Sequence, residues 1–360
     1  MIRQPKYYKN FQCIASACTD SCCKDWEIDI DEDTLQCYQK VAGDFGQRLK
    51  ENIFVPKEDD EELPHFIQTD RERCPFLNEE GLCDIFINLG EEYLSQICTH
   101  HPRYYDWFSD SSERGLGLCC EEAARLILNE KAEVAYEEIE EIEDTQEYEN
   151  ETAEEDYRLE CSLEKMLFKM RDDLFQIIHS EKSFREHMNE MYQKCLEYQA
   201  EYDQFLYSES DDFSQDYIFT DEFFEKNYLE RLIDFYRTLE INDMTWWTWL
   251  GDLKENINQI LKMQEEFDTY YSDKQKEYEN LLQYFIFRYF MKAREDDDLI
   301  GKIYFSIVSV GMIYLSDIYF YIQNKELSER AQINICKLYS KEIEYDEDNV
   351  RALYEYRIRD

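Results

Sequence analysis

The most unusual stretch of this chain is "CIASACTDSCCKDW", residues 13–26. It places four cysteines, Cys13, Cys18, Cys22 and Cys23, within eleven positions. Adjacent cysteines such as Cys22 and Cys23 pair badly in a disulfide, which requires a narrow range of geometry. The stretch therefore predicts a metal site or thiol chemistry, and the remaining cysteines have to indicate which.

Cysteines return in "RERCPFLNEEGLCDIF", "ICTHHPRYY" and "LCCEEAARLIL", so nine of the thirteen lie in four stretches. We interpret Cys37, Cys161, Cys195 and Cys336, which stand alone, as ordinary buried thiols. The short apolar runs of the first region are broken by Pro, Gly and charged residues, which predicts a thin core. Because a structural metal contributes about 10–16 kcal/mol to folding, we expect bound metal to hold this region together.

Composition narrows the class of protein. The 360 residues include 39 Lys plus Arg and 83 Asp plus Glu, a net charge of −44, which disfavours binding to nucleic acid or to an anionic membrane. A basic protein is the natural partner. The amino-terminal "MIRQPKYYKNFQ" lacks an apolar signal, so we expect a cytoplasmic protein, and thiols stay reduced in that compartment.

Prolines and glycines divide the chain. All five prolines and six of nine glycines precede residue 118, so the remainder is predicted to be nearly all helix. The most apolar segment, residues 303–316, is shorter than the about 20 residues of a membrane span and is predicted to be a buried helix. The nearby Trp246, Trp247 and Trp249 are more typical of packing than of a substrate groove, although a groove is the alternative.

These patterns predict a mainly α protein. Residues 1–129 form a cysteine-rich metal-cluster domain with a few short strands, and residues 158–360 form an all-helical bundle. Residues 130–157 form an acidic linker, because Glu137–Glu155 contains eleven acidic residues and no basic one.

The identity of the metal is open on spacing alone. Zinc sites commonly use C-x2-C pairs, whereas the first stretch reads C-x4-C-x3-C-C. A cubane iron–sulfur cluster, in which four thiolates reach separate corners, suits this irregular spacing better. Adjacent Cys22 and Cys23 bind one cluster only with a bent backbone, so one of them serves a second site or packs. Reduced core cysteines without metal are the remaining alternative.

The chain resembles the flagellin lysine-N-methylase family. The resemblance rests on "RQPKYYKNFQCIASACTDSCCKDWEIDID", "RCPFLNEEGLCDIFINLGEEYL", Cys98 with Pro102 and Arg103, "CEEAARLIL" and, late in the chain, "YFIFRYFMKA". It covers the first 130 residues closely. The resemblance implies S-adenosylmethionine-dependent methylation of flagellin lysines by an enzyme that carries a [4Fe-4S] cluster.

The resemblance also implies the metal-binding residues. The family's cysteines fall on the following positions: Cys13, Cys18, Cys22, Cys23, Cys74, Cys83, Cys98 and Cys120. Cys119 is an additional cysteine. Glu121 stands where the family has proline, and His100 and His101 lie between Cys98 and Pro102.

The cofactor site is not visible as a known motif. Gly115 and Gly117 lack the third glycine of a Rossmann loop, and Asp25 occupies the third position of the radical-enzyme pattern C-x3-C-x2-C. Candidate cofactor-binding residues are Trp26 for stacking on adenine, His100 as a base and Arg103 as a carboxylate clamp. Their ordinary alternatives are a cap over the cluster, a loop histidine and a surface ion pair. No other catalytic residue is predicted.

Two functions remain open. The first is a flagellin lysine methyltransferase, which must deprotonate a lysine whose reference pKa is about 10.4 and so needs an apolar, aromatic slot. The second is a non-catalytic, metal-stabilised module that binds a basic protein through its acidic helices. The first predicts methyl transfer to flagellin, and the second predicts binding without it.

Overall fold

The computed structural model describes residues 1–24, 26–57, 62–69, 73–140, 154–180, 182–207 and 225–356. The chain forms two compact units. The helical unit comprises Met1–Asn10, Tyr105–Cys119 and Ala124–Asp360, and the cysteine-rich unit comprises Phe11–Tyr104 and Cys120–Ala123.

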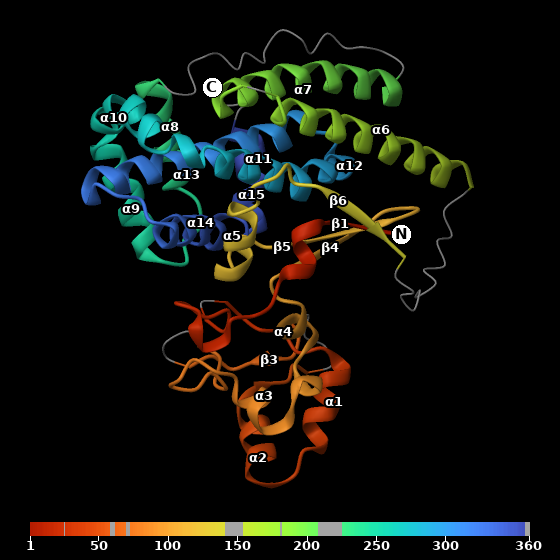
Figure 1. Cartoon of the computed structure of the whole chain (residues 1–360). Coiled ribbons are helices and arrows are strands. Elements are labelled where there is room, and N and C mark those ends of the chain that lie inside the picture. The colour runs from red at the N-terminus through yellow and green to blue at the C-terminus, as the bar shows by residue number, and fades with distance from the viewer. Residues whose placement is uncertain are drawn as a thin grey trace. The chain divides into compact units, whose positions relative to one another are not determined.

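The helical unit is built around one small sheet and a set of long helices (Figure 1). Its strands are β1 (Ile2–Pro5), β4 (Arg103–Trp107), which starts in the other unit, β5 (Ser112–Leu116) and β6 (Tyr136–Ile139). Its helices are α6 (Glu154–Ile178), α7 (Phe184–Tyr207), α8 (Lys226–Tyr236), α9 (Met244–Glu255), α10 (Ile257–Tyr270), α11 (Lys276–Tyr289), α12 (Ala293–Asp296), α13 (Leu299–Asn324), α14 (Glu329–Ile343) and α15 (Glu347–Tyr356). The short helix α5 (Glu121–Leu128) starts in the cysteine-rich unit and ends in the helical unit.

The sheet explains how one unit is inserted in the other. Its strand order is β4-β5-β1-β6, with β1 parallel to β5 and antiparallel to β6. Ile2 pairs with Ser112 and also with Ile139. Because a parallel pair needs a long crossover, the chain between β1 and β5 has room for a whole unit. Phe11–Tyr104 is that insertion.

Helix α13 is the core of the helical unit. It contacts α7, α9, α10, α11, α14 and α15, and its residues from Leu299 to Tyr319 are all buried. Asp298 caps its first turn by accepting a hydrogen bond from the Gly301 N–H at 2.9 Å. The helix is long and apolar enough to cross a membrane, but its apolar window is entirely buried within the protein. The prediction of a buried helix at residues 303–316 is confirmed.

A buried ion pair links the sheet to the helices. Arg171 of α6 and Glu113 of β5 are 0% and 2% exposed, and two guanidinium nitrogens donate to the two carboxylate oxygens. Arg171 also donates to the carbonyl of Phe287 in α11 at 3.1 Å. Such two-pronged pairs fix orientation as well as contributing energy. One residue of α6 therefore fastens three elements together.

Asp317, in the middle of α13, is a buried acid that gives a testable pH dependence. Burial raises the pKa of Asp317 well above its ordinary value, while Tyr278 donates a hydrogen bond to its Oδ2 at 2.7 Å. Above about pH 4 the unfolded chain ionises this residue and the folded chain keeps it protonated, so stability falls by about 1.4 kcal/mol per pH unit until the folded pKa is reached.

Asp317→Asn is therefore expected to be more stable than the natural chain at pH 7, because asparagine keeps the acceptor for Tyr278 and cannot ionise. Urea denaturation at pH 5 and pH 7 measures the effect. We expect the advantage of the variant to grow between these pH values. An advantage that stays constant with pH would contradict the assignment.

The cysteine-rich unit has its own small core. Its helices are α1 (Glu32–Lys40), α2 (Gly43–Glu51), α3 (Asp84–Leu89) and α4 (Gln96–His100), with β2 (Ile53–Phe54) paired antiparallel to β3 (His65–Phe66). Phe66, Phe76 and Tyr38 pack at its centre. The Tyr38 hydroxyl donates to the Tyr93 carbonyl at 2.7 Å. This core is small, as the broken apolar runs of the sequence predict.

Asp31 joins two helices of this unit. Its carboxylate caps α1 by accepting from Thr34 N–H at 2.9 Å and accepts from the Gln96 N–H at the start of α4 at 2.9 Å. Although burial alone would raise it, these bonds lower the pKa of Asp31 below its ordinary value. The stability that Asp31 adds is therefore present above about pH 4 and is lost as pH falls through the folded pKa.

Asp31→Ala is expected to destabilise the cysteine-rich unit by about 1–2 kcal/mol at pH 7, the usual cost of losing a helix N-cap. Asp31→Asn is the matched control, because asparagine caps helices nearly as well. Hydrogen exchange of the α1 and α4 peptides in the full chain measures both. Equal protection in all three proteins would contradict the proposed cap.

The predicted mainly α class is confirmed, and the observed units divide the chain at other residues than the predicted domains. The chain is mainly α, with few short strands. The predicted boundary at residue 129 differs from the observed units, because Met1–Asn10 and Tyr105–Cys119 belong with the helices. The predicted all-helical domain shares its unit with a four-stranded sheet. Within the predicted linker 130–157, Tyr136–Ile139 is strand β6, and residues 141–153 lie outside the described residues.

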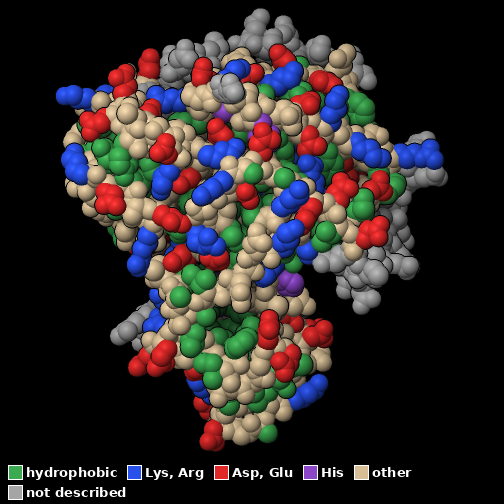
Figure 2. All heavy atoms as spheres, in the orientation of Figure 1, with side chains coloured by type: hydrophobic (Ala, Val, Ile, Leu, Met, Phe, Trp, Pro, Cys, Tyr) green, Lys and Arg blue, Asp and Glu red, His purple; other side chains and the backbone are tan. Residues whose placement is uncertain are grey.

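The surface charge is mixed locally. On the face of the helical unit that Figure 2 shows, Lys and Arg side chains are interspersed with Asp and Glu. Some of them pair, as Lys254 does with Asp234 at 2.6 Å and Lys226 with Glu230 at 3.6 Å. The net charge of −44 therefore acts on a partner mainly as a long-range field.

Candidate metal centre

The eight cysteines that match the family all lie in the cysteine-rich unit, although Cys120 is far from the others in sequence. None of the eight forms a disulfide. Their contacts divide them into two groups of four. The inner quartet is Cys23, Cys74, Cys83 and Cys98, and the outer quartet is Cys13, Cys18, Cys22 and Cys120.

The inner quartet belongs to the core of the unit. Cys74 is one of its buried core residues, and the other three pack against that core. Each of the six pairs among these thiols interacts electrostatically. Burial raises the pKa of Cys98 to about 12, and it raises the pKa of Cys74 and Cys83 as well, with contributions from the neighbouring thiols. The four sulfurs thus share one apolar site.

Local backbone structure builds the inner quartet. Cys74 N–H donates to the Cys23 carbonyl at 2.8 Å, next to an antiparallel bridge between Lys24 and Arg73. A turn then brings Cys83 back to Cys74. In that turn Asn78 Oδ1 accepts from the Leu82 N–H at 2.9 Å.

Gly81 also belongs to this turn, and its left-handed φ of +73° favours glycine. Cys83 precedes the first residue of α3, and Cys98 is supplied by α4. Backbone bonds and helix starts therefore fix the positions of these cysteines in the folded unit.

The outer quartet is more exposed. Cys13 and Cys22 are exposed, and Cys18 and Cys120 are half-buried. Burial raises the pKa of Cys120 to about 11, against hydrogen bonds from the N–H groups of Ala123 and Glu122, and Cys18 and Cys13 raise it further. Cys22 interacts with Cys120 and Cys13 in the same way. The first turn of α5 thus joins the amino-terminal loop.

Glu121 fastens this junction. Its Oε2 accepts from Thr19 N–H at 2.8 Å, from the Thr19 hydroxyl at 2.5 Å and from the Cys18 thiol at 3.6 Å. Proline is expected at this position from the resemblance, and no role is predicted for Glu121 from the sequence. Its acidic position at the start of α5, directly after Cys120, was the available signal.

Cys22 and Cys23 connect the two quartets. A hydrogen bond from Cys22 lowers the pKa of the Cys23 thiol to about 7 despite burial, with further help from Ser21 and Arg73. The same bond raises the pKa of Cys22. Cys23 is therefore the thiolate of the pair near neutral pH, and the thiolate is the form that binds metal.

The spacing of the sulfurs bears on the kind of metal. Among the residues that the structure describes, no three cysteine sulfurs lie within 4.8 Å of one another. A tetrahedral zinc ion with Zn–S bonds of about 2.3 Å holds its sulfurs about 3.8 Å apart. A cubane cluster binds each thiolate at a separate corner and spaces them more widely. The described cysteine sulfurs therefore lack the close spacing of a tetrahedral zinc site.

The predicted cofactor residues lie close to the cysteines. The Trp26 indole donates to the Cys22 carbonyl at 2.8 Å and stacks on His101, with ring centroids 6.0 Å apart. His100 is exposed at the end of α4, and the Arg103 guanidinium lies over the Phe11 ring at 4.9 Å. Their proposed roles stay predictions, and His101 is a ring next to Trp26 to which sequence reasoning gave no role.

The other cysteines are outside both quartets. Cys119 is buried in the helical unit and donates to the Tyr345 hydroxyl at 2.9 Å. Cys161, Cys195 and Cys336 are buried, as predicted. The prediction for Cys37 is wrong, because it is exposed on α1, whose buried residue is Tyr38.

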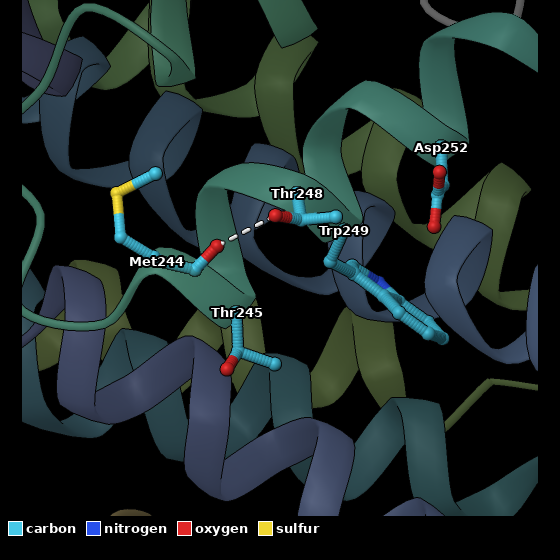
Figure 3. A pocket seen from close by; sticks show the side chains of 5 residues that line it. All are labelled: Met244, Thr245, Thr248, Trp249 and Asp252. Atoms are coloured by element: carbon cyan, nitrogen blue, oxygen red, sulfur yellow. Dashed lines mark hydrogen bonds between the residues drawn. The ribbon is translucent and has the colours of Figure 1, made fainter.

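Two further features lie outside the cysteine quartets: a cluster of two carboxylates with a histidine, and a depression on α9. Glu27, Asp29 and His65 place oxygen and nitrogen atoms within 4.8 Å of one another at the surface. On α9 of the helical unit a depression of about 440 Å³ is lined by Met244, Thr245, Thr248, Trp249 and Asp252 (Figure 3). Trp246 is buried against Tyr236 and Tyr339, so this tryptophan packs as predicted.

The fold and the site together define a class: a mainly helical protein with a second unit that carries two groups of four cysteines. Comparisons with known proteins identify the family. Residues 211–359 match the FliB lysine N-methylase C-terminal domain. The flagellar biosynthetic protein FliU of Salmonella muenchen is 30% identical over 135 residues, which is 36% of this chain and 78% of that protein.

Two proteins named lysine-N-methylase, from Salmonella choleraesuis and Salmonella typhimurium, are each 31% identical over 137 residues. The match spans 36% of this chain and about a third of either relative. No solved structure matches the chain. The chain belongs to the flagellin lysine-N-methylase family, as its cysteine motifs predicted.

Proposed function

We propose that this protein is an S-adenosylmethionine-dependent lysine N-methyltransferase that acts on flagellin in the cytoplasm. The observation that carries the proposal is the match of residues 211–359 to a lysine N-methylase domain, together with relatives named lysine-N-methylase. The acidic surface supports a lysine-bearing protein as substrate, because a net charge of −44 attracts cations over a distance.

The cysteine quartets are proposed to hold iron–sulfur cofactor. Eight cysteines lie in one small unit, and no three of their sulfurs are within 4.8 Å of one another, which supports a [4Fe-4S] cluster over a single zinc ion. S-adenosylmethionine, when bound, supplies a methyl group activated on a sulfonium. The chain's own contribution is to bind the two substrates, orient them and remove a proton from the lysine ammonium.

Trp26 is the cysteine-rich unit's best candidate for contact with the cofactor. Its ring stacks on His101 and packs against the core of the unit, and its indole N–H donates to the Cys22 carbonyl. The Arg103 guanidinium lies over the Phe11 ring and supplies a positive charge that suits a carboxylate. These two side chains are the ones proposed to contact the cofactor.

The depression on α9 is proposed to receive a lysine side chain of the substrate. It presents the Trp249 ring beside the Asp252 carboxylate (Figure 3). An aromatic face and an acid together attract an ammonium group. The depression lies within the matched methylase domain.

Trp249→Ala is expected to raise KM for flagellin about two- to thirtyfold and to change kcat little, because a cation–π contact contributes about 0.5–2 kcal/mol to binding. Steady-state methylation kinetics measure both constants. Trp247→Ala is the control, since Trp247 is covered by Arg237 at 4.0 Å and does not line the depression. An equal change in both variants would contradict a role for the depression.

The direct test of the function uses the full chain, prepared without oxygen, with S-adenosylmethionine and purified flagellin. Mass spectrometry of flagellin peptides is expected to show added methyl groups on lysines. A metal-replete protein that binds flagellin without methylating it would favour the alternative, a metal-stabilised binding module. A metal-replete protein that neither binds nor methylates flagellin would contradict both.

A further inference from the structure

Eight ligand cysteines are twice the number that one cubane cluster needs. A [4Fe-4S] cluster takes four thiolates, one for each iron. The eight thiols also differ in surroundings, because the inner quartet packs in or against the apolar core and the outer quartet does not take part in it. The number of cysteines and their different packing therefore both suggest that they form two groups.

The inner quartet is defined by packing. Cys74 is a buried residue of the apolar core, and Cys23, Cys83 and Cys98 pack against that same core. The Cys74 N–H donates to the Cys23 carbonyl at 2.8 Å, and Cys83 directly precedes α3. Four cysteines therefore lie in or against the apolar core of the unit.

The outer quartet is assembled from different parts of the chain. Its amino-terminal loop contains Cys13 and Cys18, and a backbone N–H of that loop, from Ala15, donates to Cys13 Sγ at 3.4 Å. Its fourth thiol, Cys120, arrives with α5 and is tied to the loop through Glu121. The quartet is open to solvent at Cys13 and Cys22.

The adjacent Cys22 and Cys23 belong to different quartets. Cys23 packs against the apolar core with Cys74, Cys83 and Cys98, whereas Cys22 is exposed, as Cys13 is. One cluster would have to bend the backbone sharply to bind both, and two neighbouring centres do not. The two adjacent cysteines therefore mark the boundary between the two quartets.

We propose that the cysteine-rich unit holds two four-thiolate metal centres, an inner centre that stabilises the fold and an outer, solvent-facing centre that meets the small-molecule cofactor. The division rests on the proposed iron–sulfur content and is independent of whether methyl transfer takes place. The inner centre lies in and against the apolar core, which favours a structural role. The outer centre is accessible and has Trp26 bonded to the Cys22 carbonyl.

The test counts iron and acid-labile sulfide in the full chain, prepared without oxygen. The natural chain is expected to contain about eight iron atoms, four for each cubane. The outer variant Cys13→Ser with Cys120→Ser is expected to keep about half of the iron and to stay folded by circular dichroism. Cys37→Ser, an exposed cysteine outside both quartets, is the control and should keep all of it.

The outer variant decides the question even if inner variants do not fold. An outer variant that keeps all of its iron, or loses all of it, would overturn the proposal of two centres. A natural chain with four iron atoms would do the same. In the two-centre account, Cys74→Ser also loses about half of the iron or unfolds the unit, and a folded Cys74→Ser variant with full iron would contradict it. Methylation of flagellin is assayed separately, so failure of the function does not imitate failure of the proposal.

Discussion

Removing the metal from the full chain is expected to unfold the cysteine-rich unit and leave the helical unit folded. The unit has a small core, and bound structural metal contributes an apparent stabilisation of about 10–16 kcal/mol in small metal-dependent domains. Without metal, burial works against every thiolate of the inner quartet, and only at Cys23 do hydrogen bonds from Cys22 and Ser21 and the charge of Arg73 outweigh it. No other single change is expected to cost as much.

Hydrogen exchange with mass spectrometry measures this effect unit by unit. After treatment with a chelator and an oxidant of the cluster, peptides from Phe11–Tyr104 should lose protection, and peptides of α13 should keep it. Reconstitution with iron and sulfide is the control and should restore the lost protection. Unchanged protection in metal-free protein would show that the core alone holds the unit.

Arg171→Met is expected to destabilise the helical unit by about 3–5 kcal/mol, because the buried carboxylate of Glu113 loses its two-pronged partner and keeps the Arg3 guanidinium at 4.0 Å. The bond to the Phe287 carbonyl is lost as well. Denaturation followed by exchange of the α6 and α11 peptides measures the change in unfolding free energy. The exposed pair Lys254–Asp234 supplies a control, since Lys254→Met should cost less than about 1 kcal/mol.

The double variant Arg171→Met with Glu113→Gln distinguishes the cost of leaving a buried charge unpaired from the cost of losing packing around Arg171. Removing both charges avoids a lone buried ion, so the double variant should be more stable than Arg171→Met alone. If the double variant is the less stable of the two, the cost arises from lost packing, such as the stacking of Arg171 on Phe287 at 4.9 Å.

Sequence patterns predicted the parts of the fold that one segment determines. The apolar run at residues 303–316 became the buried centre of α13, because only a core can cover a helix that is hydrophobic all round. The cysteine motifs predicted the family, and all eight matching cysteines lie in one unit. Such features depend on residue type and spacing, which a sequence displays directly.

Features that join distant segments could not be predicted in this way. The pairing of β1 with β5 crosses an inserted unit, and nothing in the residues near Ile2 indicates that Ser112 is its partner. The salt bridge between Arg171 and Glu113 also looks like two ordinary charges in sequence. The division of the cysteines into quartets depends on which thiols meet in space, so spacing left it open.

We propose that the cysteine-rich unit binds inorganic iron and sulfide through these eight thiols. Native mass spectrometry of the full chain, prepared without oxygen, measures this binding. We expect a folded species heavier than the polypeptide by its iron and sulfide, with the excess lost in denaturing solvent. A folded and active species with the mass of the bare polypeptide would overturn the proposal.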